Sequence, residues 1–179
     1  IREAMALSCG MIAMIDDAVG ALIDKLKAIG RYEDTVIVFN ADHGDYLGDF
    51  GLLLKGALPF QSIMRVPFIW SDPASRQAHV SNALASTIDL APTILARAGV
   101  GPYNGIQGKS LLGNMDGSSA LRTHLLTEHQ DTGTRMGRKQ HMLLRNLITD
   151  DWRLTYYRGE GWGELYDLRN DPHETHNLW

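Results

Sequence analysis

The sequence predicts an α/β fold followed by a small β-rich part. A helical pattern over residues 2–29 leads into Thr35–Asn40, a short β-branched segment with the composition of a buried strand. A polar, glycine-rich segment, residues 41–56, follows that strand directly. Beyond about residue 115, short segments separated by turn residues are typical of antiparallel strands. We therefore expect an α/β domain over residues 1–114 and a small antiparallel subdomain over residues 115–179.

The first element is predicted to be a long amphipathic helix. Its apolar residues recur three or four positions apart, which places them on one face, and Gly30 is a suitable C-cap. Cys9 falls on this helix and is interpreted as a small packing residue. It is the single cysteine, so an intrachain disulfide is excluded. The apolar positions are Leu7, Met11, Ile15, Ala18, Leu22, Leu26 and Ile29.

The middle of the chain contains a second strand and a second helix. Val66–Trp70 has the composition of a buried strand, and the turn residues that follow end it. Residues 84–98 have a helical pattern, but Pro92 cannot occupy the interior of a helix. We therefore expect Thr87–Asp89 to form a first turn, with Pro92 near the start of the main helix.

The C-terminal part is predicted to contain four antiparallel strands. Asn146 and the pair Asp150–Asp151 are the expected bend formers, because short polar side chains favour turns. The predicted strands are Thr123–Glu128, His141–Thr149, Arg153–Tyr157 and Gly163–Leu168.

Composition narrows the class of protein. Of the 179 residues, 44% are hydrophobic and 21% charged, as in ordinary globular proteins. The net charge of -4 and the lack of like-charge blocks predict no nucleic-acid partner and no anionic membrane surface. No uninterrupted apolar run approaches the roughly 18 residues of a membrane span.

The first residues of the sequence do not have the features of a natural N-terminus. Ile1 is not an initiator methionine, and the helical pattern begins at once. We therefore expect further sequence upstream, together with any targeting signal. A single cysteine fits a reducing compartment, and cytoplasm and periplasm both stay open.

The segment after the first strand carries the candidate chemistry. Asp42 and His43 offer oxygen and nitrogen donors on rigid backbone, which suits a divalent cation. Gly44 permits a sharp turn. Lys55, at the far end of the loop, is a cation that could fold back over an anionic ligand. The alternative is structural: an aspartate that forms a turn, a surface histidine and a solvated lysine.

Longer motifs favour the chemical interpretation. The segment DHGDYLGDFGLLLKG, residues 42–56, resembles the second signature of the sulfatase family. Phe50 departs from it, since many relatives carry histidine there. Further pieces that resemble the family follow in order: Arg65-Val66-Pro67, Thr87-Ile88-Asp89-Leu90-Ala91-Pro92-Thr93, Gly108-Lys109-Ser110-Leu111, Leu165-Tyr166-Asp167-Leu168 and Asp171-Pro172-His173-Glu174.

The resemblance implies a fold and a site. The fold would be the C-terminal part of the mixed-sheet, alkaline-phosphatase-like sulfatase domain plus a small antiparallel subdomain. Asp42 and His43 match two metal ligands, for Ca²⁺ or, alternatively, Mg²⁺ or Mn²⁺. Lys55 matches the lysine that contacts the sulfate group, a catalytic and substrate-binding role.

The resemblance also shows what this chain lacks. The family's nucleophile is a formylglycine made from Cys or Ser in a Cys/Ser-x-Pro/Ala-x-Arg signature. Cys9 lies in Cys-Gly-Met-Ile-Ala, which has neither the proline or alanine nor the arginine. The nucleophile and two further metal-binding aspartates are therefore expected upstream, in a missing N-terminal half. This chain alone is expected to be inactive.

The sequence and the resemblance leave three functions open. The first is a sulfuric ester hydrolase that cleaves a small sulfated substrate with the help of a metal. The second is a phosphonate monoester or phosphodiester hydrolase of the same superfamily. The third is a non-catalytic binding or structural module that kept the fold. Besides its substrate, the partners expected are the N-terminal half and, as an option, a second copy of the chain.

Overall fold

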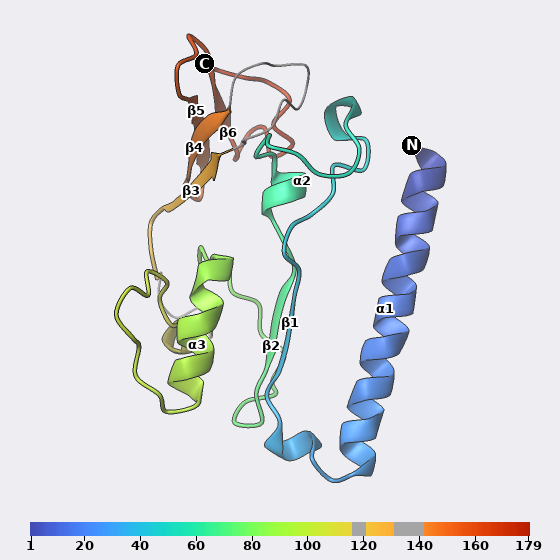
Figure 1. Ribbon diagram of the computed structural model, residues 1–179. Helices are drawn as coiled ribbons and strands as arrows, with labels where there is room; N and C mark the ends of the chain where they lie inside the picture. Colours follow the sequence, from blue (N-terminus) through green and yellow to red (C-terminus); the bar gives the residue numbers. More distant parts are fainter. Residues whose placement is uncertain (116–120, 131–141) are drawn as a thin grey trace. The chain divides into compact units, whose positions relative to one another are not determined.

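The structure, a computed structural model, describes residues 1–115, 121–130 and 142–179. These residues form two compact units, Ile1–Gln77 and Ala78–Trp179, which are treated separately below (Figure 1). The α/β class is confirmed. The domain boundary predicted between residues 114 and 115 is one of the full-length protein, and it stays a prediction.

Helix α1, Arg2–Ala28, confirms the predicted first helix, but none of its residues is buried. Cys9 is exposed as well, so its packing role is not seen in this chain. Exposed apolar residues lie on more than one face of α1, which is typical of a helix that is enclosed by other elements. The exposed large apolar residues are Met5, Leu7, Met11, Ile12, Met14, Ile15 and Leu22.

By its length and mean hydropathy, helix α1 could cross a membrane, although it contains no long uninterrupted apolar run. It is long enough to span a bilayer, and its best 18-residue window has a mean hydropathy of 1.7. This criterion differs from that of an uninterrupted apolar run, so the expected absence of a membrane partner stays a prediction. Asp16 and Asp17 lie in its middle. Length and composition alone do not distinguish a membrane span from a core helix.

Strands β1, Ile37–Asn40, and β2, Phe68–Ser71, form an antiparallel pair in the first unit. Both lie within three residues of their predicted bounds. The mixed sheet is not seen, since every strand pair in the described part of the chain is antiparallel. The short elements here are the 3₁₀ turns Tyr32–Asp34 and Asp49–Gly51 and helix α2, Gln61–Met64.

The second unit begins with the predicted turn and helix. The 3₁₀ turn Thr87–Asp89 leads into α3, Leu90–Arg97, so Pro92 does fall in the first turn of the main helix. Asp89 is fully buried, and the Arg122 guanidinium binds both of its carboxylate oxygens. A short 3₁₀ turn, Leu112–Asn114, follows.

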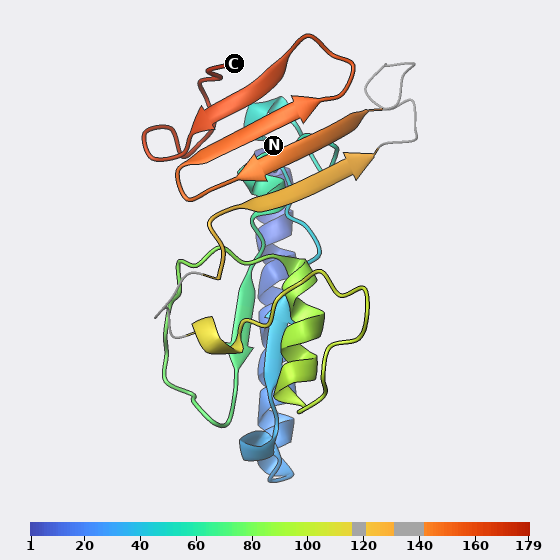
Figure 2. The same ribbon diagram turned by 90° about the vertical axis from the view of Figure 1, so that its left-hand side faces the viewer.

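The rest of the second unit is a four-stranded antiparallel sheet in the order β3-β4-β5-β6 (Figure 2). Its presence confirms the predicted β-rich part. The predicted start at His141 lies outside the described residues. The strands are β3, Leu125–Gln130; β4, Leu143–Ile148; β5, Trp152–Tyr157; and β6, Gly163–Asp167.

Asn146 does not form a bend, so that prediction is wrong. It lies in the middle of β4 and is fully buried. Its side-chain oxygen accepts a hydrogen bond from the Thr155 hydroxyl at 2.9 Å, which satisfies a polar group inside the sheet. The turn between β4 and β5 falls at Asp150–Asp151, as predicted.

One face of the sheet is built around a buried cation. Arg153 on β5 is 1% exposed and contacts two carboxylates. Its Nη1 donates to Glu164 at 2.8 Å, and its Nε donates to Glu174 from the C-terminal segment. The Tyr157 hydroxyl donates to the other Glu164 oxygen at 2.9 Å. Burial and the nearby Glu164 charge raise the pKa of Tyr157.

Candidate functional site

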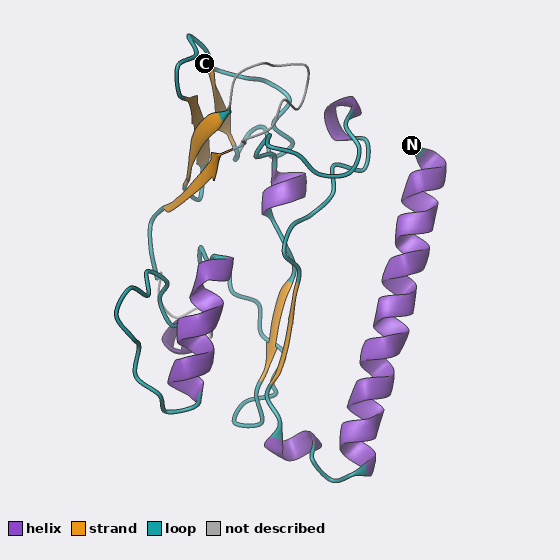
Figure 3. Ribbon diagram, in the orientation of Figure 1, coloured by secondary structure: helices purple, strands orange, loops and turns teal. Residues whose placement is uncertain are grey.

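The candidate site lies in the first unit, on the loop that leaves β1 at Asn40 (Figure 3). Backbone bonds fix this loop against α2, since the Gly44 N–H donates to the Ile63 carbonyl at 2.9 Å. The contact is close: a methyl carbon on Gly44 would stand 1.8 Å from the Ser62 carbonyl oxygen. The Ser62 carbonyl therefore leaves no room for a side chain at position 44, so only glycine fits there.

The imidazole of His43 has a defined orientation. Its Nδ1 lies 2.7 Å from the Gly44 carbonyl oxygen. A carbonyl only accepts, so Nδ1 carries the proton and Nε2 is the unprotonated nitrogen, which has a lone pair. This backbone contact is the usual way in which proteins present Nε2 to a metal ion.

Asp42 lies beside His43 and is open to solvent. Its side chain is 86% exposed, and its Oδ2 is 3.5 Å from His43 Nε2. The His43 backbone N–H donates to Asp42 Oδ1 at 2.9 Å. That hydrogen bond is the main reason why the pKa of Asp42 lies below its ordinary value, and the charge of Lys55 acts in the same direction. The carboxylate is thus ionised at neutral pH.

Lys55 returns to the same place from the far end of the loop. Its ammonium nitrogen is 2.8 Å from His43 Nε2, across twelve residues of sequence. Because Nδ1 holds the imidazole proton, the ammonium donates and Nε2 accepts. The structure therefore brings together the three residues selected from the sequence: Asp42, His43 and Lys55.

The donor atoms fit a divalent cation. Two ligands of one ion, each at about 2.1–2.4 Å from it, lie roughly 3.0–3.4 Å apart. The Asp42 Oδ2 to His43 Nε2 distance of 3.5 Å lies just above this range. Both atoms offer lone pairs, so a cation between them removes their repulsion. Within the described ranges no cluster of three or more His, Cys, Asp or Glu residues that could hold a metal ion forms.

The loop between His43 and Lys55 contains a residue that sequence reasoning missed. Tyr46 is only 3% exposed and forms the buried centre of the loop. Its hydroxyl donates to the Leu58 carbonyl at 2.8 Å. No periodic pattern indicated this burial, because a loop has no regular inward face. Asp45 is a turn former, as its carboxylate accepts the Leu47 N–H at 2.8 Å.

Phe50, the residue that differs from the family signature, packs against another aromatic ring. Its ring stacks on Phe60, with centroids 3.9 Å apart. Phe50 has a φ of 54°, a left-handed conformation that is uncommon for a bulky residue. The stacking therefore compensates for an unfavourable backbone conformation at this position.

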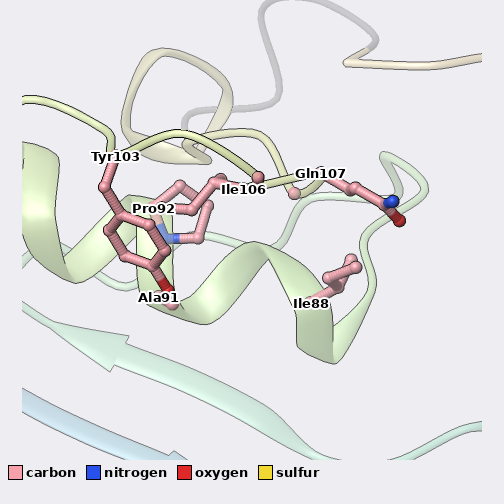
Figure 4. Close-up of a pocket in the computed structure, with 8 residues that line it drawn as sticks. Ile88, Ala91, Pro92, Tyr103, Ile106 and Gln107 are labelled. Carbon is pink, nitrogen blue, oxygen red and sulfur yellow. The ribbon is translucent and has the colours of Figure 1, made fainter.

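A cavity of about 210 Å³ lies in the second unit (Figure 4). The ring of Tyr103 lies beside Ala91 and Pro92 at one end of it. Its lining includes no acidic, basic, histidine or cysteine side chain. Its polar side chains are those of Tyr103 and Gln107.

The fold and the comparisons with known proteins first define the class. The chain matches solved structures of alkaline-phosphatase-superfamily proteins, and it carries a four-stranded antiparallel sheet. Within that superfamily the chain belongs to the sulfatase family, whose pattern, described as "Sulfatase", matches residues 2–100.

Individual relatives agree with the family assignment. The chain is 31% identical to the multifunctional alkaline phosphatase superfamily protein PehA of Trinickia caryophylli, over 99% of this chain and 37% of PehA. It is 32% identical to the uncharacterized sulfatase YidJ of Escherichia coli, over 92% of this chain and 32% of YidJ. The chain therefore spans about a third of the length of these relatives.

Solved structures share the fold. BT4656, solved with its substrate D-glucosamine-2-N,6-O-disulfate, matches with a TM-score of 0.82 and 25% identity, over 93% of this chain and 34% of that one. The phosphonate monoester hydrolase SpPMH from Silicibacter pomeroyi matches with a TM-score of 0.77 and 26% identity, over 88% of this chain and 33% of that one. Both sulfate and phosphonate chemistry thus occur on this fold.

Proposed function

We propose that this chain supplies part of the active site of a sulfuric ester hydrolase. The observation that carries the proposal is the meeting of Asp42, His43 and Lys55, with His43 Nε2 at 3.5 Å from the carboxylate and 2.8 Å from the ammonium. A donor pair and a cation that meet at one point suit a negatively charged ester group next to a metal ion.

Each residue has a distinct proposed role. The ionised Asp42 carboxylate and the Nε2 lone pair of His43 would hold a divalent cation, with Ca²⁺ expected first and Mg²⁺ or Mn²⁺ as alternatives. The Lys55 ammonium binds a sulfate oxygen and stabilises the charge on it in the transition state. A cation at this place would take up the Nε2 lone pair that now accepts from Lys55, which would leave the ammonium available to the substrate.

The bound cation would orient the nucleophile and neutralise developing negative charge. The nucleophile is expected to be a formylglycine upstream of this chain. Cys9 remains excluded from that role, since its sequence context lacks the signature and it lies on α1. We propose that the remaining ligands and the nucleophile lie outside this chain, which spans about a third of the length of its relatives, and that the chain alone is inactive.

Small sulfated sugars are the first substrates to test. The reason is the similarity to BT4656, whose structure contains a sulfated glucosamine. The phosphonate monoester or phosphodiester alternative is supported by the similarity to SpPMH and to the multifunctional PehA. A tetrahedral anion next to a metal and a lysine occurs in either reaction, so these three residues do not separate the two.

Parallel assays of the full-length protein test the proposal. Aryl sulfate, phenyl phosphonate and bis-aryl phosphate esters would be compared under the same conditions, with the Lys55→Ala variant as the control. The proposal predicts the highest kcat/KM for the sulfate ester and a loss of about 10²-fold in turnover in Lys55→Ala. Preference for the phosphonate or phosphodiester would overturn the sulfatase assignment, and full activity of Lys55→Ala would remove Lys55 from the site.

A further inference from the structure

We infer that Tyr46 is a positioning residue, which holds the Lys55 ammonium beside His43. This inference rests on the proposed function of Lys55. It concerns a residue three positions from His43 that neither binds the metal nor contacts the substrate in the proposed site.

Tyr46 is bonded to the chain on both sides of Lys55. Its backbone N–H donates to the carbonyl of Leu54, the residue before the lysine, at 2.9 Å. Its hydroxyl donates to the carbonyl of Leu58, three residues after the lysine, at 2.8 Å. One residue therefore fixes the backbone before and after Lys55.

The ring of Tyr46 adds a steric constraint at Gly56. A methyl carbon on Gly56 would lie 3.3 Å from the Tyr46 hydroxyl oxygen and 3.4 Å from the ring carbon Cε2. The backbone directly after Lys55 thus lies against the tyrosine ring. The ring itself packs edge-to-face on Phe60, with centroids 6.4 Å apart and planes 74° apart, which prevents it from rotating away.

Lys55 cannot hold this position through its own packing. The residue is exposed, and a lysine side chain loses considerable rotamer entropy when it is confined. Leu54 has a φ of 63°, unfavourable for a leucine, and this turn directs the chain back toward His43 at the next residue. The bond from Tyr46 to the Leu54 carbonyl stabilises that turn.

A double-mutant cycle in the full-length protein tests the inference. Tyr46→Phe keeps the ring and removes only the hydroxyl bond, so Lys55 should be placed less often next to His43. We expect kcat/KM to fall about tenfold, or about 1.4 kcal/mol, and the Kd of inorganic sulfate, measured by calorimetry, to rise by a similar factor. In the Lys55→Ala background, Tyr46→Phe should change sulfate affinity by less than about twofold, because the group it positions is gone.

The control is Tyr157→Phe, which removes another buried tyrosine hydroxyl bond, to Glu164 at 2.9 Å. It should lower the melting temperature without changing sulfate affinity. If Tyr46→Phe weakens sulfate binding equally with and without Lys55, or leaves it unchanged, Tyr46 does not position the lysine. If Lys55→Ala itself binds sulfate normally, the proposed role of Lys55 fails instead, and the two failures are therefore distinguishable.

Discussion

The substitution Gly44→Ala tests how tightly the site depends on backbone packing. The new methyl carbon would stand 1.8 Å from the Ser62 carbonyl oxygen, whereas real contacts of this kind are not below 3.0 Å. The loop and α2 must therefore separate by about 1.2 Å. That movement stretches the 2.9 Å hydrogen bond between the Gly44 N–H and the Ile63 carbonyl beyond bonding distance.

His43 precedes Gly44 and takes its orientation from the Gly44 carbonyl, so the imidazole moves with the loop. Misplacement of a catalytic group by about 1 Å can cost on the order of 10²-fold in rate. We therefore expect kcat/KM of the full-length Gly44→Ala variant to fall by about that factor. The assay is initial-rate hydrolysis of an aryl sulfate, with circular dichroism to show that the variant is folded.

The matched control is Gly161→Ala, the same chemical change at a glycine with no atom within 4 Å of the added carbon. It should leave both activity and stability unchanged. Wild-type activity in Gly44→Ala would refute the reasoning, because it would show that the loop absorbs the methyl group without moving His43. Equal losses in both variants would indicate a general effect of the substitution.

Three further predictions concern the second unit and α1. Arg122→Met leaves the buried Asp89 carboxylate without its cation, which should cost about 3–5 kcal/mol of unfolding free energy in urea; an unchanged midpoint would contradict the buried pair. Burial alone would raise the pKa of Asp89, but the Arg122 bonds hold it below its ordinary 3.8. The stabilisation of the fold by the ionised Asp89 is therefore complete above about pH 4 and is lost as the pH falls through the lower folded pKa. In Asp89→Asn, the free energy of unfolding should depend less on pH in this acid range. The exposed Cys9 thiol should react rapidly with a thiol reagent in the isolated chain, and protection there would show that α1 is covered.

The candidate site could be predicted because its residues are consecutive or belong to one motif. Asp42 and His43 adjoin a strand of recognisable composition, and Lys55 is part of the same signature. The sequence predicted which residues would meet, but the tautomer of His43 depends on a backbone carbonyl that no pattern reveals. The packing of Tyr46 was missed for a related reason, since burial in an irregular loop follows no period.

The strands were predicted more reliably than their turns. Asn146 has the composition of a bend former, yet it pairs with Thr155 inside the sheet. Local propensity is overridden here by a buried polar network around Arg153, whose partners come from three separate segments. Such a network is visible only once the strands are in register.

The environment of α1 could not be predicted from this chain. Its amphipathic pattern predicted a buried face, but the apolar residues are exposed. The chain spans about a third of the length of its relatives. The mixed sheet was not predicted correctly either, since the two strands of the first unit form an antiparallel pair.

Metal binding by Asp42 and His43 is the central claim, and a thermal titration tests it most directly. The melting temperature of the full-length protein would be followed with increasing Ca²⁺ and, separately, Mn²⁺, in parallel with the Asp42→Ala variant. A cation that binds the folded state raises its stability, so the wild type should show a rise that saturates and Asp42→Ala should not. An equal rise in both proteins, or none in the wild type, would contradict the site described here.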